Sequence, residues 1–164
     1  MPGLRNPPAQ GKPESDASIA RSLMRESRTA ALATLQAGSA PFASYVITAP
    51  AADGSPLLLL SALAVHSQNL ARDPRASMLL VREAEAAIEG MAAVRLTLTG
   101  HVIAEDNAVS QRLFLQCHPD AARYAGFRDF SFHRLEVDGG HLVAGFGRIV
   151  ELARAELLDE PALG

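Results

Sequence analysis

Residues 94–102 read VRLTLTGHV, and polar and apolar side chains alternate here more regularly than anywhere else in the sequence. Arg95, Thr97, Thr99 and His101 fall on one face, and the valines and leucines fall on the other. Because successive side chains of a strand point to opposite faces, this pattern predicts an antiparallel strand with one buried face. The polar face, with its arginine, is then directed to solvent, to a partner subunit or to a ligand lying across the sheet.

Short apolar segments on both sides of this stretch predict more strands. Gly38 and the Asp53-Gly54 pair lie in connections of hairpin length, and 138–140 (DGG) predicts the turn of a terminal hairpin. The predicted strands cover residues 30–36, 41–49, 56–61, 76–83, 94–102, 130–137 and 141–147.

Helical spacing and stop signals predict helices over residues 16–28, 66–72, 105–117 and 151–158, with a loop over 84–93. Strands in hairpin order with helices at the start and in two crossovers do not give strict βαβ alternation. A mainly β fold, an antiparallel barrel with peripheral helices, satisfies this order because closing the sheet removes its exposed edges.

Composition limits the classes of function. The 164 residues are 48% hydrophobic, which fits one compact domain, predicted for residues 14–164, after a disordered tail over 1–13 with four prolines. The net charge of −3 argues against nucleic-acid binding. No apolar run approaches the roughly 18 residues that a spanning helix needs. With a lone Cys117 and no visible secretory signal, the sequence predicts a cytoplasmic protein.

Residues 61–74 (SALAVHSQNLARDP) contain the strongest candidate binding site. A strand ends at Ser61 and a short helix opens near His66 or Ser67, so the first-turn N–H groups and the helix dipole favour a phosphate there. His66, Ser67 and Asn69 add side-chain donors at the same end. The alternative is that Ser67 only caps the helix and Asn69 is an ordinary residue of its first turns.

Other motifs are absent or ambiguous. The five histidines are dispersed without metal-ligand spacing, and no nucleotide-binding glycine motif or nucleophile elbow occurs. Taken alone, Arg95 and Thr97 are more typical of a solvated face than of a ligand site. The glycines of 145–147 (GFG) suggest either a close approach to the backbone or a bulge that closes the barrel.

Together these fragments resemble one family. The pattern of Leu32 to Leu35, Gly38, Pro41 and Ser44 is followed by LLLLSALAVHSQNLARDPRASMLL (57–80), RLTLTGHV (95–102) and DFSFHRLEVDGGHLVAGFG (129–147). This order resembles the pyridoxamine 5′-phosphate oxidase-like FMN-binding split-barrel superfamily, specifically its haem-utilisation branch. The resemblance covers roughly residues 17–150.

The resemblance implies a six-stranded antiparallel split β-barrel that forms homodimers and holds FMN in clefts at the subunit interface. It places Ser44 beside the flavin or its ribityl chain, and Ser61 at the end of the strand that flanks the ring. The other implied cofactor contacts are His66, Ser67 and Asn69 at the phosphate, Arg95 and Thr97 at the flavin edge or phosphate, and Phe146 from the partner subunit.

The sequence therefore predicts an FMN-dependent oxidoreductase acting on an unknown small-molecule substrate. It departs from pyridoxamine-phosphate oxidases by lacking their C-terminal R-L-x-P segment. It departs from haem-degrading members by having no histidine after His141, so haem would need His133, His141 or another internal histidine. A haem-binding or haem-degrading protein, and a non-catalytic binding barrel, are the alternatives.

Overall fold

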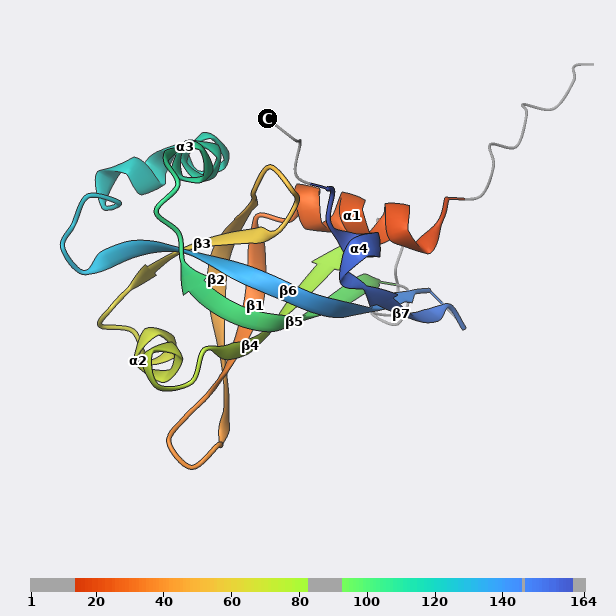
Figure 1. Ribbon diagram of the computed structural model, residues 1–164, viewed down its shortest axis with the longest axis horizontal. Coiled ribbons are helices and arrows are strands. Elements are labelled where there is room, and N and C mark those ends of the chain that lie inside the picture. Colours follow the sequence, from red (N-terminus) through yellow and green to blue (C-terminus); the bar gives the residue numbers. More distant parts are fainter. Residues whose placement is uncertain (1–13, 83–92, 146, 161–164) are drawn as a thin grey trace, which may run out of the picture.

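The computed structural model describes residues 14–82, 93–145 and 147–160 (Figure 1). The predicted tail over 1–13, nearly all of the predicted loop over 84–93, and Phe146 lie outside these residues.

Within these residues, seven strands form one antiparallel sheet, in the order β3-β2-β1-β4-β5-β6-β7. Pairing of β3 with the first part of β6 closes six of them into a barrel, and β7 pairs with the second part of β6. The predicted closed six-stranded barrel is confirmed, with one strand added. The strands are β1 (Thr29–Leu35), β2 (Pro41–Pro50), β3 (Pro56–Ser61), β4 (Arg75–Arg82), β5 (Val94–Ala104), β6 (Phe130–Ala144) and β7 (Ile149–Ala153).

Helices cover the two ends of the barrel and part of its outside (Figure 1). No helix in the described part of the chain is long and apolar enough to cross a bilayer. The helices are α1 (Asp16–Glu26), α2 (Val65–Arg72), α3 (Ala108–Cys117), the 3-10 turn η2 (Pro119–Arg123) and α4 (Arg154–Leu157).

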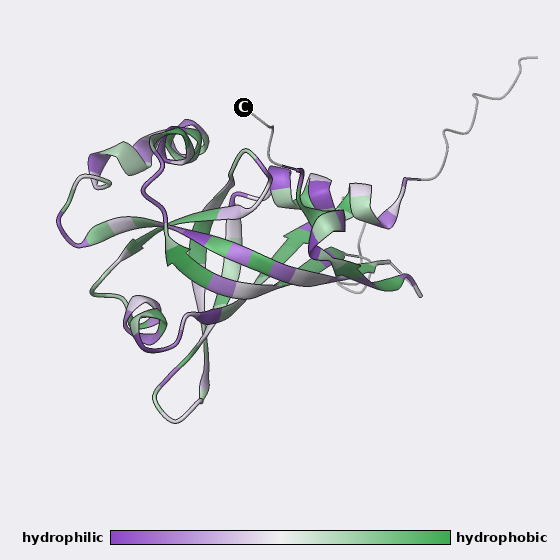
Figure 2. Ribbon diagram, viewed as in Figure 1, coloured by the Kyte–Doolittle hydropathy of each residue, from purple (hydrophilic) through white to green (hydrophobic). Residues whose placement is uncertain are grey.

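The inward side chains of the strands form the main core. Leu32, Leu58 and Leu98, on three strands, are each 0% exposed. Apolar residues of α1 and α4 pack into this core at one end, and Leu70 of α2 packs against it near the other. Outside the barrel, Phe114 of α3 is the centre of a second apolar cluster over β2, β3 and the start of β6. Figure 2 shows the alternation of hydrophobic and hydrophilic residues along the strands that this arrangement requires.

The second apolar cluster leaves part of the outer face open. One row of paired residues crosses six strands there, and its two large apolar members are exposed: Tyr45 is 77% exposed and Leu79 is 37% exposed. We call the outward side chains of β5, β6 and β7 in this region the outer face of β5–β7. The row consists of Tyr45, Ala31, Leu79, Thr97, His141 and Glu151.

The terminal hairpin predicted over 130–137 and 141–147 is wrong, because Phe130–Ala144 is one continuous strand. The 138–140 segment is absorbed by an irregularity in the β5–β6 pairing, where the partner of Thr99 is Gly139 and the partner of Gly100 is Val137. Gly100 is needed because a Cβ atom there would lie 2.0 Å from the Glu136 carbonyl oxygen. The glycines thus allow close packing inside the sheet instead of a turn.

The actual turn lies at the later glycines. Gly145 and Gly147 have φ of 73° and 76°, and the Ala144 N–H donates to the Arg148 carbonyl at 2.9 Å. The predicted helix over 151–158 is replaced by the end of β7 and the single turn of α4, because β7 continues from this turn along β6.

Candidate functional site

The end of the barrel beneath α2 brings together two predicted site residues. The Nδ1 atom of His66 lies 3.1 Å from the Ser44 hydroxyl, which projects from β2. The helix begins at Val65 after Ala64, so Ser67 is in its first turn and does not cap it. Among the described residues no side chain caps this N-terminus. The N–H groups of Ser67 and Gln68 bond to the Ala64 carbonyl, so the donors suited to an anion are those before Ser67. We call this region the barrel mouth.

Asn69 is buried and has its side-chain amide committed inside the chain. Its Nδ2 donates to the Thr34 hydroxyl at 3.0 Å, and its Oδ1 accepts from Arg72 at 2.8 Å. Asn69 is 1% exposed and Thr34 is 2% exposed. These bonds hold α2 against β1, so the local geometry gives Asn69 a structural task.

Two predicted serines differ in their partners. The Ser61 hydroxyl donates to Asp129 at 2.7 Å and accepts from the Leu63 N–H at 3.2 Å, so it orders the turn between β3 and α2. The Ser67 Oγ atom is buried and has no hydrogen-bond partner within residues 14–82, 93–145 and 147–160. Such an atom fits a site that an additional group completes.

Two histidines at the mouth are poorly placed to carry charge. Burial and the nearby His133 lower the pKa of His66. Burial lowers the pKa of His133, whose Nδ1 atom lies 3.1 Å from the Ser131 carbonyl oxygen. Both imidazoles are therefore biased toward the neutral form, which can bind a metal but binds an anion poorly.

The arginines around the mouth are engaged. A cavity of about 260 Å³ opens beside Thr34, Arg75 and Ser77. The Arg75 guanidinium donates to Asp73 at 2.6 and 2.9 Å and lowers the pKa of that carboxyl to about 2. A phosphate in this cavity would compete with a carboxylate for Arg75.

The structure does not bring Arg95 and Thr97 to the barrel mouth of the same chain. Both lie on the outer face of β5–β7, where Arg95 pairs with Val81. Val81 is six residues along β4 from Arg75, which follows α2, and this separation corresponds to about 20 Å of strand. Phe146 lies outside the described residues. The predicted site residues thus form two groups, one at the mouth and one on the outer face.

His141 and Glu151 form a pair on that outer face. The Nδ1 atom of His141 lies 2.5 Å from the Glu151 carboxylate across β6 and β7. The His141 side chain is 45% exposed. Sequence reasoning overlooked this pair because it assigned Glu151 to a helix. Strand alternation continued through His141 to a turn at 145–147 is the signal that could have found it.

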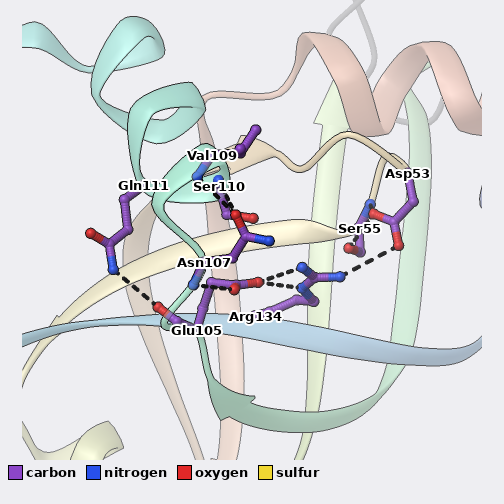
Figure 3. A network of polar contacts seen from close by, with 8 residues as sticks. All are labelled: Asp53, Ser55, Glu105, Asn107, Val109, Ser110, Gln111 and Arg134. Atoms are coloured by element: carbon purple, nitrogen blue, oxygen red, sulfur yellow. Dashed lines mark hydrogen bonds and ion pairs between the residues drawn. The ribbon is translucent and has the colours of Figure 1, made fainter. Parts of the chain in front are cut away.

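A second acidic–basic network also escaped sequence reasoning (Figure 3). Arg134 of β6 contacts the Glu105 carboxylate at 2.5 and 2.6 Å, and Glu105 also accepts from the Asn107 N–H at 3.0 Å. Asp53 lies 3.6 Å from Arg134. The Glu105 side chain is only 8% exposed. This network joins the start of α3 to β6, and its groups satisfy one another.

Comparison with known families gives the strongest evidence for classification. The family model described as "CREG, beta-barrel" matches residues 11–157. The chain belongs to the CREG β-barrel family. Its fold is also that of a pyridoxamine 5′-phosphate oxidase-type protein from Listeria innocua, with a TM-score of 0.61 over 77% of this chain and 97% of the other at 13% identity. The resemblance to the haem-utilisation branch of the split-barrel superfamily is confirmed.

Several proteins similar to this chain are named for haem. The chloroplastic heme oxygenase HOZ of Arabidopsis thaliana is 37% identical over 108 residues, which are 64% of this chain and 32% of HOZ. The heme oxygenase HutZ of Vibrio cholerae is 26% identical over 141 residues, 82% of this chain and 80% of HutZ. A heme-binding protein from Mycobacterium smegmatis has a TM-score of 0.81 at 31% identity, covering 87% of this chain and 59% of the other. The chain thus spans about a third of the length of the plant relative.

The metal-ligating side chains of the described residues suit a metal that is already held in a cofactor. Within the described ranges, no group of three or more His, Cys, Asp or Glu side chains could hold a metal ion. A porphyrin supplies four ligands to its iron and needs one further side chain, which an imidazole can provide. A single imidazole of the described residues would therefore be enough to complete the ligands of such an iron.

Proposed function

We propose that this CREG β-barrel protein binds haem and takes part in haem breakdown. Two curated relatives are named heme oxygenases, and a solved structure with 31% identity is named a heme-binding protein. These relationships carry the proposal. They favour haem over the FMN-dependent oxidoreductase expected from the sequence, although the same fold accommodates either group.

Haem breakdown consumes dioxygen and electrons, which an external reductant would supply. The chain would bind and orient the macrocycle, and its sheet would shield one side of it. The test is titration of the purified protein with iron protoporphyrin, followed by a reductant in air. A saturable shift of the Soret band at one haem per chain, then loss of that band with release of iron, is the expected result. No saturable shift would refute the proposal.

FMN is the second candidate, supported by the uncapped N-terminus of α2 and the unpartnered Ser67 Oγ. In this alternative Ser44, Ser61, His66, Ser67 and Asn69 surround the flavin and its phosphate, as the family resemblance implies. Equilibrium dialysis against FMN separates the candidates. Micromolar retention that a Ser67→Ala variant weakens would favour the flavin site, whereas no retention would leave haem alone.

We further propose that two copies pair through the exposed apolar side chains of β1, β2 and β4. Tyr45, Leu79 and Val81 lie there with small alanines between them. Such a contiguous apolar surface is typical of a protein interface. Light scattering at micromolar concentration should give a dimer, and Tyr45→Glu should give a monomer. The single domain over 14–164 and the cytoplasmic location remain predictions.

A further inference from the structure

The outer face of β5–β7 combines an oriented imidazole, a cation and apolar surface. His141 pairs across the sheet with Thr97 on one side and with Glu151 on the other. Arg95 is the diagonal neighbour of His141, with Cα atoms about 7–8 Å apart. These three functional groups project from the same side of the sheet.

The pair of His141 and Glu151 has the arrangement of an oriented metal ligand. A ligating histidine donates its second ring N–H to a carboxylate or carbonyl, which fixes the tautomer and strengthens the ligand. The Nδ1 atom of His141 meets the Glu151 carboxylate at 2.5 Å. This contact directs the proton to Nδ1, and Nε2 has no hydrogen-bond partner in the part of the chain that the structure describes.

The surroundings of His141 suit a flat, amphipathic ligand. Val143 lies two residues along β6, and Ile149 and Val81 are 63% and 48% exposed in the adjacent row of paired residues. Apolar side chains on a sheet favour the face of a macrocycle, and a guanidinium favours a carboxylate. Arg95 has no ion pair with the carboxylates of the described residues, so it is available for a ligand carboxylate.

The other histidines offer less. His66 is backed by a hydroxyl. The ring of His118 lies 2.8 Å from the Thr48 carbonyl and beside Phe114. Within the described residues, His133 has a polar contact only with a backbone carbonyl of its own strand, at 3.1 Å. His101 contacts Asp138 at 3.3 Å, but its strand partners are the charged residues Arg75 and Glu136. His141 is therefore the histidine that joins a carboxylate partner to apolar surroundings.

We propose that His141, oriented by Glu151, is the axial ligand of haem iron on the outer face of β5–β7, and that Arg95 binds a haem propionate. The assignment rests on the proposed haem-binding function. It gives specific tasks to His141, Glu151 and Arg95, of which the sequence placed Glu151 in a helix and Arg95 at a flavin. It also places the haem at the edge of the proposed dimer surface.

The test compares iron protoporphyrin with metal-free protoporphyrin as probes. Removal of the axial ligand should affect only the iron form, so His141→Ala should weaken iron protoporphyrin binding at least about 100-fold and leave metal-free binding unchanged. Glu151→Gln should weaken the iron form about 10-fold. Added imidazole should restore the absorption spectrum of the ligated iron to His141→Ala. His101→Ala is the matched control, because it removes another carboxylate-paired histidine, and it should bind both probes like the wild type.

Arg95 is tested through the propionates. Arg95→Met should weaken both porphyrins, and this difference should vanish when their dimethyl esters are used. Wild-type protein that fails to bind iron protoporphyrin refutes the proposed function itself. Tight binding by the wild type that His141→Ala leaves intact refutes only the assignment of the ligand, and loss of binding in His66→Ala would then place the iron at the barrel mouth.

Discussion

The two halves of β6 each carry a pair of a basic residue and a glutamate, and the pairs differ in burial. Arg134 meets Glu105, whose side chain is 8% exposed, beneath the start of α3. His141 meets Glu151, whose side chain is 80% exposed, on the outer face of β5–β7. In the first half, Arg134 contacts Glu105 and Asp53, and these contacts hold the segments around the barrel together. In the second half the pair contributes little to folding, and its outer nitrogen is available to a ligand.

The largest effect is expected from breaking the buried pair. Arg134→Met leaves the Glu105 carboxylate buried without its cation, which should lower the free energy of unfolding by about 3 kcal/mol. Urea denaturation followed by circular dichroism measures this change. Adding Glu105→Gln to the same chain removes the unpaired charge and should recover part of the loss. An unchanged denaturation midpoint in Arg134→Met would mean that the buried pair is not structural.

The next effect concerns the barrel mouth, where Asn69 bonds to Thr34 and Arg72. Asn69→Ala leaves the buried Thr34 hydroxyl without its donor and should cost about 1–3 kcal/mol of stability. The affinity of the folded protein for iron protoporphyrin should stay unchanged, because the proposed haem site is on the outer face of β5–β7 and Asn69 is at the barrel mouth. A large loss of haem affinity without a loss of stability would instead assign Asn69 to the ligand site.

Acidic pH should destabilise the protein through two partly buried histidines at the barrel mouth, His66 of α2 and His133 of β6. Burial lowers the pKa values of His66 and His133 in the folded state, so the unfolded chain binds more protons once the pH falls below about 6.5. The free energy of unfolding should therefore fall as the pH drops through about 6.5 toward the lowered folded-state pKa values. Urea midpoints at pH about 7.5 and 5.5 measure this, and a double His66→Gln, His133→Gln variant should show a smaller difference. An equal difference between the two urea midpoints in the wild type and the double variant would show that His66 and His133 do not cause the pH dependence.

The smallest change in stability is expected at the exposed pair. Glu151→Gln should alter the free energy of unfolding by less than about 1 kcal/mol, because exposed ion pairs contribute little. Urea denaturation and iron protoporphyrin titration of the same variant should therefore show a small loss of stability together with a clear loss of haem affinity. A loss of stability as large as that of Arg134→Met would show that the second half of β6 is also structural.

The sequence was sufficient for the barrel, because alternation in 94–102 and turn residues between short apolar segments define strands locally. It was insufficient at residues 138–140, since glycines that permit close packing against Leu152 or Leu157 look like glycines that permit a turn. That error hid the long β6 and placed Glu151 in a helix. The bond between Asn69 and Thr34 joins residues 35 positions apart, and no local pattern reports such a contact.

The location of iron in a crystal of the protein grown with iron protoporphyrin tests the central claim most directly. Anomalous scattering at the iron absorption edge gives the metal position independently of any model of the macrocycle. We expect the iron within bonding distance of His141 Nε2, on the outer face where Arg95 also projects. Iron beside His66 and His133 beneath α2 would contradict the account.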